Sequence, residues 1–164
     1  MPKTILLTGP PAAGKNSVAY HLAHLREKCA VIDVDDIRWM LRQPHIHPWE
    51  DGAHVVLELA IKQASMLAHS FLGEGYDTVI LDVVNTNTLA LYQSLLPIKT
   101  VALTPSLSEL ETRLQGRGDT ELSDRQRELH ERYKTLNIFD LKIDNSEIPP
   151  EDLAQRINAW MNTL

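Results

Sequence analysis

The sequence predicts a three-layer α/β/α sandwich with a parallel sheet of about five strands. Three observations support this fold class. Short apolar runs alternate with longer segments of helical periodicity along the 164 residues. Strand–helix–strand units of this kind make right-handed crossovers, which cover a parallel sheet on both faces. The length suits one domain with its own core, so we expect a single domain over residues 1–164.

Composition narrows the class of protein. The formal net charge is −6, which argues against nucleic acid as a partner, because a polyanion needs a basic track. Cys29 is the only cysteine, so we expect no disulfide framework and a cytoplasmic location. Lys3 and the loop at Gly9 interrupt any apolar leader, and we expect no later segment to span a membrane.

The first strand and its following loop carry the strongest motif. An apolar run at residues 5–7 leads into GPPAAGKNS and then directly into a helix-like segment. Gly9 and Gly14 permit backbone angles that let amide groups turn inward around an anion. Lys15 adds an ammonium at the positive end of the helix. The residues expected to bind nucleotide phosphates are Gly9, Pro10, Pro11, Ala12, Ala13, Gly14, Lys15, Asn16 and Ser17.

One position departs from the phosphate-loop pattern. Asn16 follows Lys15 where the pattern has Ser or Thr, whose hydroxyl would hold magnesium. Ser17 does not replace it, because one residue along a helix turns the side chain by about 100°. An amide oxygen can approach a hard cation, so we expect Asn16 to act as the metal ligand. The departure bears on catalytic efficiency more than on nucleotide binding.

The second strand, at residues 30–32, ends in three acids. Asp33, Asp35 and Asp36 follow it, with Arg38 just beyond. The C-terminal ends of strands line the ligand crevice of an open α/β sheet. We expect Asp35 to be the general base, although all three acids are also suited to cap the next helix. Arg38 either binds an acidic group of the acceptor or pairs with a neighbouring acid.

A loop and a long helix follow. Residues 43–51 have no periodicity and end near Trp49, which either walls the acceptor pocket or anchors the core. His45 and His47 have no cysteine or acidic triad at metal-ligand spacing. We therefore expect either substrate-loop residues or solvent-exposed histidines rather than metal ligands. Residues 52–72 are amphipathic with helical periodicity.

The third strand, at residues 78–81, ends in Asp82. This acid is expected near the metal, because an acid at the end of a buried strand commonly serves there. Asn85 and Asn87 follow in a polar stretch that predicts the cap of a short helix. The same two residues are expected to help form the acceptor pocket.

The last third of the chain predicts a lid and two further strands. Strands are expected at residues 98–103 and 141–144, and a lid at residues 113–135. Arg117 is flanked by glycines, which favours a moving segment. Arg113 and Arg117 are either lid residues that close on the nucleotide or members of surface salt bridges. The remaining arginines of the lid are expected on a solvated helix face.

Four motifs resemble those of small P-loop kinases, over nearly the whole chain. GPPAAGKNS is similar to the Walker A phosphate loop of that group. DVDDIR resembles the second-strand motif of bacteriophage polynucleotide 5′-hydroxyl kinases. RLQGRGD is similar to the lid of chloramphenicol phosphotransferase-like and related ATPase-type kinases, and DLKIDNS also looks like that group. The resemblance implies the P-loop nucleoside triphosphate hydrolase fold. It also implies roles for Asp35 as the base, Arg38 at the acceptor phosphate, Arg117 as the lid arginine and Asn145 near the adenine.

Residues and resemblance together predict an ATP-dependent kinase. It would transfer the γ-phosphate to a hydroxyl of a small-molecule acceptor, with ATP and Mg²⁺ as cofactors. One alternative is a polynucleotide 5′-hydroxyl kinase, which requires a basic groove that leads to Asp35 and Arg38. Another is a non-catalytic nucleotide-binding switch protein, which Asn16 suggests. The identity of the acceptor and the choice between ATP and GTP stay open.

Overall fold

The computed structural model describes residues 1–118 and 121–164. Within this part of the chain, five parallel strands form one sheet in the order β2-β3-β1-β4-β5. The strands are β1 (Thr4–Thr8), β2 (Cys29–Asp33), β3 (Asp77–Leu81), β4 (Ile98–Leu103) and β5 (Leu141–Ile143). The predicted α/β sandwich with a five-stranded parallel sheet is therefore confirmed. The central position of β1 places the phosphate loop in the middle of one sheet edge.

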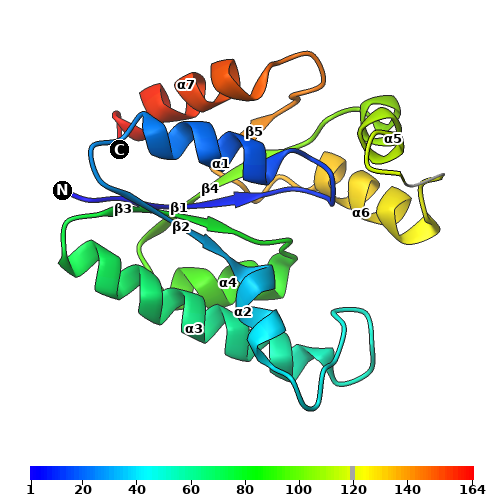
Figure 1. The fold of residues 1–164 in the computed structure, drawn as a ribbon, viewed down its shortest axis with the longest axis horizontal. Coiled ribbons are helices and arrows are strands. Elements are labelled where there is room, and N and C mark those ends of the chain that lie inside the picture. Colours follow the sequence, from blue (N-terminus) through cyan, green and yellow to red (C-terminus); the bar gives the residue numbers. More distant parts are fainter. Residues whose placement is uncertain (119–120) are drawn as a thin grey trace.

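Helices cover both faces of the sheet (Figure 1). The helices are α1 (Lys15–His24), α2 (Val34–Met40), α3 (Ala53–Gly73), α4 (Thr86–Leu95), α5 (Leu107–Gln115), α6 (Asp124–Thr135) and α7 (Pro150–Met161). In Figure 1, α1 and α7 lie on one face, and α3 and α4 lie on the other. All strands point toward the end where α2, α5 and α6 gather, and both termini lie at the opposite end. The loops at the strand C-terminal ends thus converge on one region.

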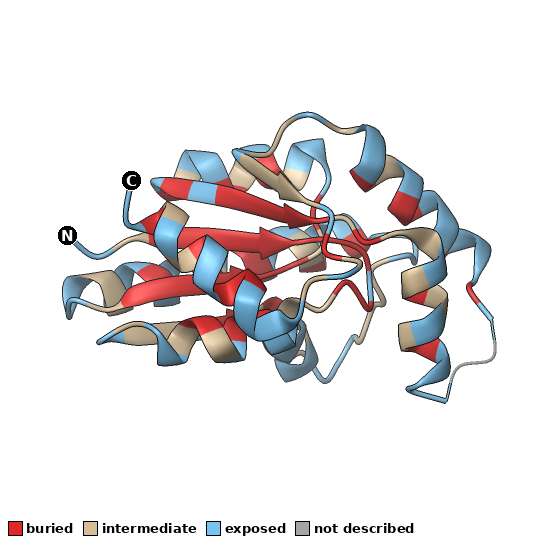
Figure 2. Cartoon of the chain, turned by 90° about the horizontal axis from the view of Figure 1, so that it is seen from above, coloured by how far each residue is buried: buried red, intermediate tan, exposed pale blue. Residues whose placement is uncertain are grey.

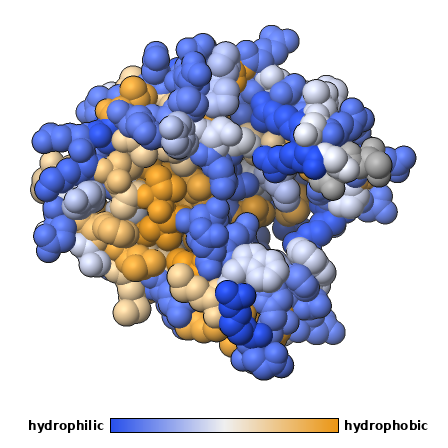
Figure 3. Space-filling view, viewed as in Figure 1, coloured by the Kyte–Doolittle hydropathy of each residue, from blue (hydrophilic) through white to orange (hydrophobic). Residues whose placement is uncertain are grey.

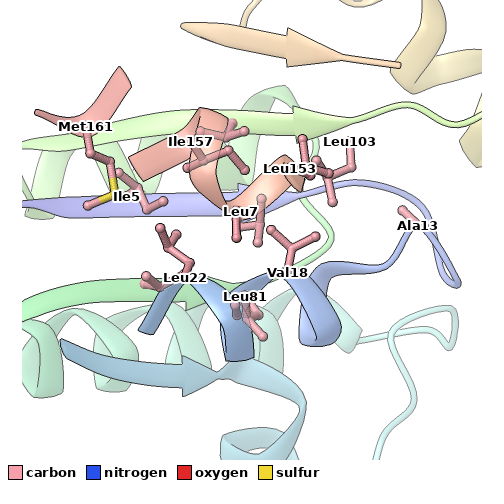
Figure 4. Close-up of a cluster of buried hydrophobic side chains, with 14 residues drawn as sticks. Ile5, Leu7, Ala13, Val18, Leu22, Leu81, Leu103, Leu153, Ile157 and Met161 are labelled. Carbon is pink, nitrogen blue, oxygen red and sulfur yellow. The ribbon is translucent and has the colours of Figure 1, made fainter. Parts of the chain in front are cut away.

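Two hydrophobic cores hold the three layers together. Leu7 packs with Leu22 and Ile157 in the core beneath α1 and α7 (Figure 4). On the opposite face, Leu6 and Tyr92 belong to the core beneath α3 and α4. Successive side chains of a strand point to opposite faces, so neighbouring residues of β1 enter different cores. Figure 2 shows the result, with buried strands between helices whose outer faces are exposed.

The helix starts follow local capping chemistry. The Asp33 carboxylate accepts a hydrogen bond from the Asp35 N–H at 3.0 Å and begins α2. Asn85 and Thr88 form a reciprocal capping box at the start of α4. Side-chain oxygens at these positions satisfy amide groups that the helix itself leaves unpaired. Both capping residues lie at the same sheet edge as the phosphate loop. The caps therefore fix where α2 and α4 begin beside that loop.

Helix α3 corrects one expectation from the sequence. It is 21 residues long and, by length and composition alone, apolar enough to cross a membrane. The expectation that no later segment meets this criterion is therefore wrong. Ala60, Ala64 and Ala68 form a stripe at helical spacing and pack in the core beneath α3 and α4. An apolar core helix passes the same test of length and composition, because its buried stripe raises its mean hydropathy.

Candidate active site

The phosphate loop has backbone angles that few residues other than glycine adopt. Gly9 has φ of 149°, and a Cβ there would lie 2.5 Å from the Leu103 carbonyl oxygen. Gly14 precedes α1 with φ of 97° and provides no side-chain cap. Since α1 has neither a capping side chain nor an acid in its first turn, its first amide groups and its positive dipole end can receive an anion.

Lys15 lies folded across this loop. Its Nζ donates to the carbonyl oxygens of Gly9 at 2.9 Å and Pro10 at 3.2 Å. Burial lowers the pKa of the Lys15 ammonium to about 8, and the nearby charges of Asp82 and Asp33 partly oppose this shift. A cation is thus held at the loop by main-chain oxygens and nearby acids, in the position expected from the sequence.

Arg113 and Asn145, from segments distant in sequence, hydrogen-bond to the main chain of the phosphate loop. The Arg113 guanidinium donates to the Ala13 carbonyl at 2.9 Å and to the Asn145 carbonyl at 3.0 Å. The Asn145 amide also donates to the Ala13 carbonyl, at 2.9 Å, and Asn145 is buried. Glu109 pairs with Arg113 at 2.8 Å. Both predicted residues therefore contact the phosphate loop, and they do so as supports of its main chain.

The acids after β2 are held by specific partners. Asp33 accepts from the Asp35 N–H through Oδ1, and from the Asn16 amide at 3.1 Å through Oδ2. The Asp35 side chain is 63% exposed and forms an ion pair with Arg38. Arg38 also reaches Asp82 at 3.3 Å. Of the two roles open to Arg38 from the sequence, pairing with a neighbouring acid is observed.

Asp82 is buried and satisfied by protein donors. It accepts from the Tyr92 hydroxyl at 2.9 Å, from the Val83 N–H at 2.8 Å and from Arg38. Burial raises the pKa of the Asp82 carboxyl. The Arg38 charge and these hydrogen bonds act in the opposite direction and lower it. The side chain that was expected near the metal thus connects α4 to Arg38 at the edge of the site.

Three cavities adjoin along this edge of the sheet. The loop cavity, about 320 Å³, is lined by Pro11, Ala12, Gly14, Lys15, Asn16, Ser17, Asp33, Asp35, Leu81, Asp82, Val83 and Arg117. The α7 cavity, about 600 Å³, is bounded by residues that include Gly14, Ser17, Arg113, Arg117, Asn145 and Pro149. The tryptophan cavity, about 390 Å³, is bounded by residues that include Pro11, Asp35, Arg38, Trp39, His45, His47, Trp49, Asn85, Arg125 and Arg132. Figure 3 shows the molecule hollowed at this end, between the side of α5 and α6 and the side of the loop after α2.

Two predicted residues stand where cavities meet. Asp35 lines both the loop cavity and the tryptophan cavity. Arg117 lines both the loop cavity and the α7 cavity. Asn85 reaches the wall of the tryptophan cavity while it caps α4. Asn87 is not among the lining residues of that cavity, although the sequence had placed both asparagines at the acceptor.

Sequence reasoning missed several residues of the site. Arg125 and Arg132 were expected on a solvated face. Arg125 is exposed and Arg132 is partly exposed, and both also line the tryptophan cavity. The Arg125 guanidinium lies 4.7 Å from the centre of the Trp49 ring. The alternating charges along α6 predicted exposed side chains, and no local sequence signal identified which arginines border the cavity. The predicted lid motif ends at Asp119, which lies outside the described residues.

The donor set around the loop cavity suits a hard cation. In residues 1–118 and 121–164, no group of three or more His, Cys, Asp or Glu side chains is placed to hold a metal ion alone. The residues that line the loop cavity include Asn16, Asp33, Asp35 and Asp82, all of which carry side-chain oxygens. Mg²⁺ commonly takes one or two protein ligands together with substrate phosphates and water. The residues therefore fit a magnesium ion that arrives with a nucleotide.

The parallel sheet and the glycine-bounded loop between β1 and α1 define a P-loop fold of the type found in small kinases. The model of the AAA domain family matches residues 5–134, and the chain belongs to that family. No curated protein matches the sequence.

Solved structures support the same fold. The tunicamycin resistance protein of Deinococcus radiodurans superposes with a TM-score of 0.80 at 15% identity, over 98% of this chain and 96% of that one. A sugar kinase from Janibacter sp. HTCC2649 has a TM-score of 0.73 at 13% identity, over 99% and 95%. The APS kinase of Mycobacterium tuberculosis, solved with AMPPNP and APS, has a TM-score of 0.72 at 17% identity, over 98% of both chains. At these identities the likeness concerns the fold, and it confirms the resemblance to small P-loop kinases at that level.

Proposed function

We propose that this protein is an ATP-dependent phosphotransferase that transfers the γ-phosphate to a hydroxyl of a small-molecule acceptor. The observation that supports this most is the place of Asp35, whose side chain borders both the loop cavity and the tryptophan cavity. A carboxylate between a phosphate site and a second pocket can receive the proton of an acceptor hydroxyl. Sugar kinase and APS kinase among the similar folds agree with this class of reaction.

The nucleotide would extend from the loop cavity into the α7 cavity. Its phosphates would lie against the first turn of α1, with Lys15 at the outer phosphates and the base beside Asn145. The loop conformation and the uncapped start of α1 support this placement. Residues 113–135 would act as a lid, and Arg117 would bring its charge to the transferring phosphoryl group. An enzyme that uses ATP in this way would work in the cytoplasm.

In the transfer step, the acceptor oxygen attacks the γ-phosphorus while its proton passes to the Asp35 carboxylate. The bond between the γ-phosphorus and the β–γ bridging oxygen breaks, and ADP leaves. Arg38 pairs with Asp35, which orients the carboxylate before it takes the proton. Lys15 and Arg117 offset charge on the phosphates, and Asn16 would hold a Mg²⁺ ion, which would supply further positive charge to the transferring phosphoryl group.

A pair of matched variants tests this proposal. Asp35→Asn should lower phosphate transfer by about 10²- to 10⁴-fold, as expected for loss of a general base. The affinity for ATP should change little, because Asp35 does not contact the phosphate loop's amides. Asp36→Asn is the control, since Asp36 lies in the same first turn of α2 and is exposed. Transfer by Asp35→Asn at the rate of the control would refute the assignment.

A further inference from the structure

One wall of the tryptophan cavity is a continuous row of aromatic rings. Trp39 stacks on His45, with ring centres 4.4 Å apart and planes at 17°. His45 meets His47 edge to face at 5.0 Å, and His47 stacks on Trp49 at 4.8 Å and 7°. The four rings thus form a single ladder, from the end of α2 through the loop that follows it.

The ladder is fixed by the backbone around it. His45 Nδ1 lies 3.2 Å from the Leu41 carbonyl oxygen, just after α2 ends. The His47 N–H donates to the Glu50 carboxylate at 2.6 Å, and the Glu50 N–H donates back to the His47 carbonyl at 3.0 Å. The first contact holds the His45 ring against the main chain, and the other two fix the backbone at His47. The ring wall is therefore part of the built structure of the loop.

The two tryptophans of this wall remain largely open to solvent. Trp39 is 54% exposed and Trp49 is 63% exposed. An indole is more often buried, since it carries a large apolar surface. Two exposed indoles beside one cavity form the kind of apolar patch that marks a binding site. Planar rings stack well on such surfaces, and each contact adds to affinity.

The charges around the cavity are unequal. Its lining contains Arg38, Arg125 and Arg132, and Asp35 is the acid among them. Arg38 is engaged by Asp35 and Asp82. Arg125 covers the Trp49 ring, and Arg132 pairs at 3.2 Å with Glu128, four residues earlier on α6. Arg38 and Arg132 are thus paired with acids, whereas no ion pair of Arg125 is found within residues 1–118 and 121–164. The Arg125 charge at the cavity favours an anionic ligand.

The geometry sets the order of groups along a bound molecule. Asp35 and Pro11 stand at the end that the tryptophan cavity shares with the loop cavity. The reacting hydroxyl must lie there, beside the phosphate donor. The remainder of the molecule must then extend between the ring ladder and α6. A volume of about 390 Å³ fits a small organic molecule.

We propose that the acceptor is a small organic anion that carries a planar aromatic ring as well as its hydroxyl. The ring packs against the Trp39–Trp49 ladder, and a carboxylate or phosphate group pairs with Arg125 and Arg132. This inference rests on the proposed phosphotransferase function and names the substrate class of the same site. A saturated polyol would gain little from the arginines. An oligonucleotide end conflicts with the net charge, although its bases would stack.

Three matched probes separate ring from charge. They are 3-(hydroxymethyl)benzoate, benzyl alcohol, which lacks the charge, and 3-(hydroxymethyl)cyclohexanecarboxylate, which lacks the aromatic ring. Calorimetry gives each affinity, with the ATP site filled by a non-hydrolysable analogue. Quenching of indole fluorescence locates binding, and Trp160→Phe removes the one tryptophan outside the cavity wall. The benzoate should bind at least fivefold tighter than either of the other probes and should quench the remaining indoles.

Two variants assign the effect to residues. Arg125→Gln should abolish the advantage of the benzoate over benzyl alcohol, and Trp39→Leu should abolish its advantage over the cyclohexane acid. Arg127→Gln should leave all three affinities unchanged, because Arg127 lies on the same helix but pairs with Glu111 outside the cavity. These differences are changes in binding, so they are measured whether or not the probe is phosphorylated.

Several results would overturn the proposal. If the cyclohexane acid binds as tightly as the benzoate, the acceptor does not need an aromatic ring. If benzyl alcohol binds as tightly as the benzoate, the arginines do not contribute to binding. Tighter binding of a 5′-hydroxyl oligonucleotide than of the benzoate would indicate nucleic acid, and no binding of any probe would refute the assignment outright. The proposed function is judged separately by ATP-dependent transfer. Transfer to a neutral sugar would support the kinase and refute this acceptor class. Selective binding of the benzoate without transfer to any acceptor would refute the kinase and leave only a binding site for aromatic anions.

Discussion

Asn16 donates a hydrogen bond to Asp33, with Nδ2 3.1 Å from Oδ2. A carboxylate only accepts, so the amide nitrogen must face it and the Asn16 carbonyl oxygen must point elsewhere. Asp33 is itself held by the Asp35 N–H at 3.0 Å. The residue that replaces the usual Ser or Thr of the phosphate loop is thus oriented by the acid that starts α2, and its oxygen is left available for a cation.

This contact predicts a magnesium effect. Asp33→Ser keeps a good helix cap but removes the carboxylate that holds the Asn16 amide. We expect the affinity of the ATP complex for Mg²⁺ to fall by about tenfold, the size of effect seen when a ligand loses its orienting partner. Asn16→Ala should produce a similar loss, and the double variant should be no worse than the single ones. Calorimetric titration of Mg²⁺ measures this. Unchanged Mg²⁺ affinity in Asn16→Ala would exclude Asn16 as a ligand.

Lys15 predicts a pH dependence of nucleotide binding. Burial lowers its pKa to about 8, and an anionic nucleotide favours the charged ammonium. Below this pH the free protein already carries the charge. Above it, binding must also take up a proton, so the Kd for ATP should rise by up to about tenfold for each further pH unit. Titrations from pH 7 to 10 check this slope. Lys15→Gln should bind weakly with no such rise, and a flat profile in the unaltered protein would contradict the role.

Because Asn145 supports the main chain of the phosphate loop, we expect its substitution to lower the stability of the fold. Asn145 is buried and donates to the Ala13 carbonyl. Asn145→Ala leaves this carbonyl with fewer partners and should lower the free energy of unfolding by about 1–3 kcal/mol. Urea unfolding followed by circular dichroism measures the change. Asn137→Ala, at an exposed position before β5, provides a comparison. Equal effects of the two substitutions would argue against a special role for Asn145.

Tyr133 links α6 to the end of the sheet through hydrogen bonds. Its buried hydroxyl lies 2.7 Å from Thr8 Oγ1, accepts from the Val84 N–H at 2.7 Å and donates to the Val84 carbonyl at 2.9 Å. Tyr133→Phe removes these hydrogen bonds and leaves the Val84 N–H with only its longer contact to Thr8 Oγ1 at 3.4 Å. The substitution should lower the free energy of unfolding by about 1–3 kcal/mol. Amide exchange in α6 should accelerate as well. Tyr20→Phe, at a side chain that is 63% exposed, should change neither quantity.

Local patterns explain why much of the fold could be predicted. The apolar run before Gly9, the helix after Lys15 and the acids after the second strand each follow from spacing along the chain. Parallel strands place these loops at one edge, which is why Asp35 was expected opposite the phosphate loop. Asp35 lines the loop cavity together with Lys15 and Asn16. The cap formed by Asn85 could also be read locally, since the polar stretch directly precedes a helical period.

Contacts between distant segments could not be read in this way. Tyr133 and Thr8 are 125 residues apart, and Arg38 and Asp82 are 44 apart. Residue type indicates that a buried hydroxyl or guanidinium needs a partner, but it does not say which one. For the same reason, the alternating charges of α6 gave no sign that Arg125 lies over Trp49. Long-range packing therefore determines which side chains line the tryptophan cavity.

The central claim is that ATP donates its γ-phosphate to an organic hydroxyl at Asp35. The most direct measurement incubates the protein and Mg²⁺ with γ-³²P-labelled ATP and a panel of hydroxyl compounds, and then separates phosphate esters from inorganic phosphate. The account predicts label in an ester, at a rate that falls by at least about 10²-fold in Asp35→Asn. Label that appears only in inorganic phosphate would indicate an ATPase, and label that stays in ATP would indicate a nucleotide-binding switch; either result would contradict the account.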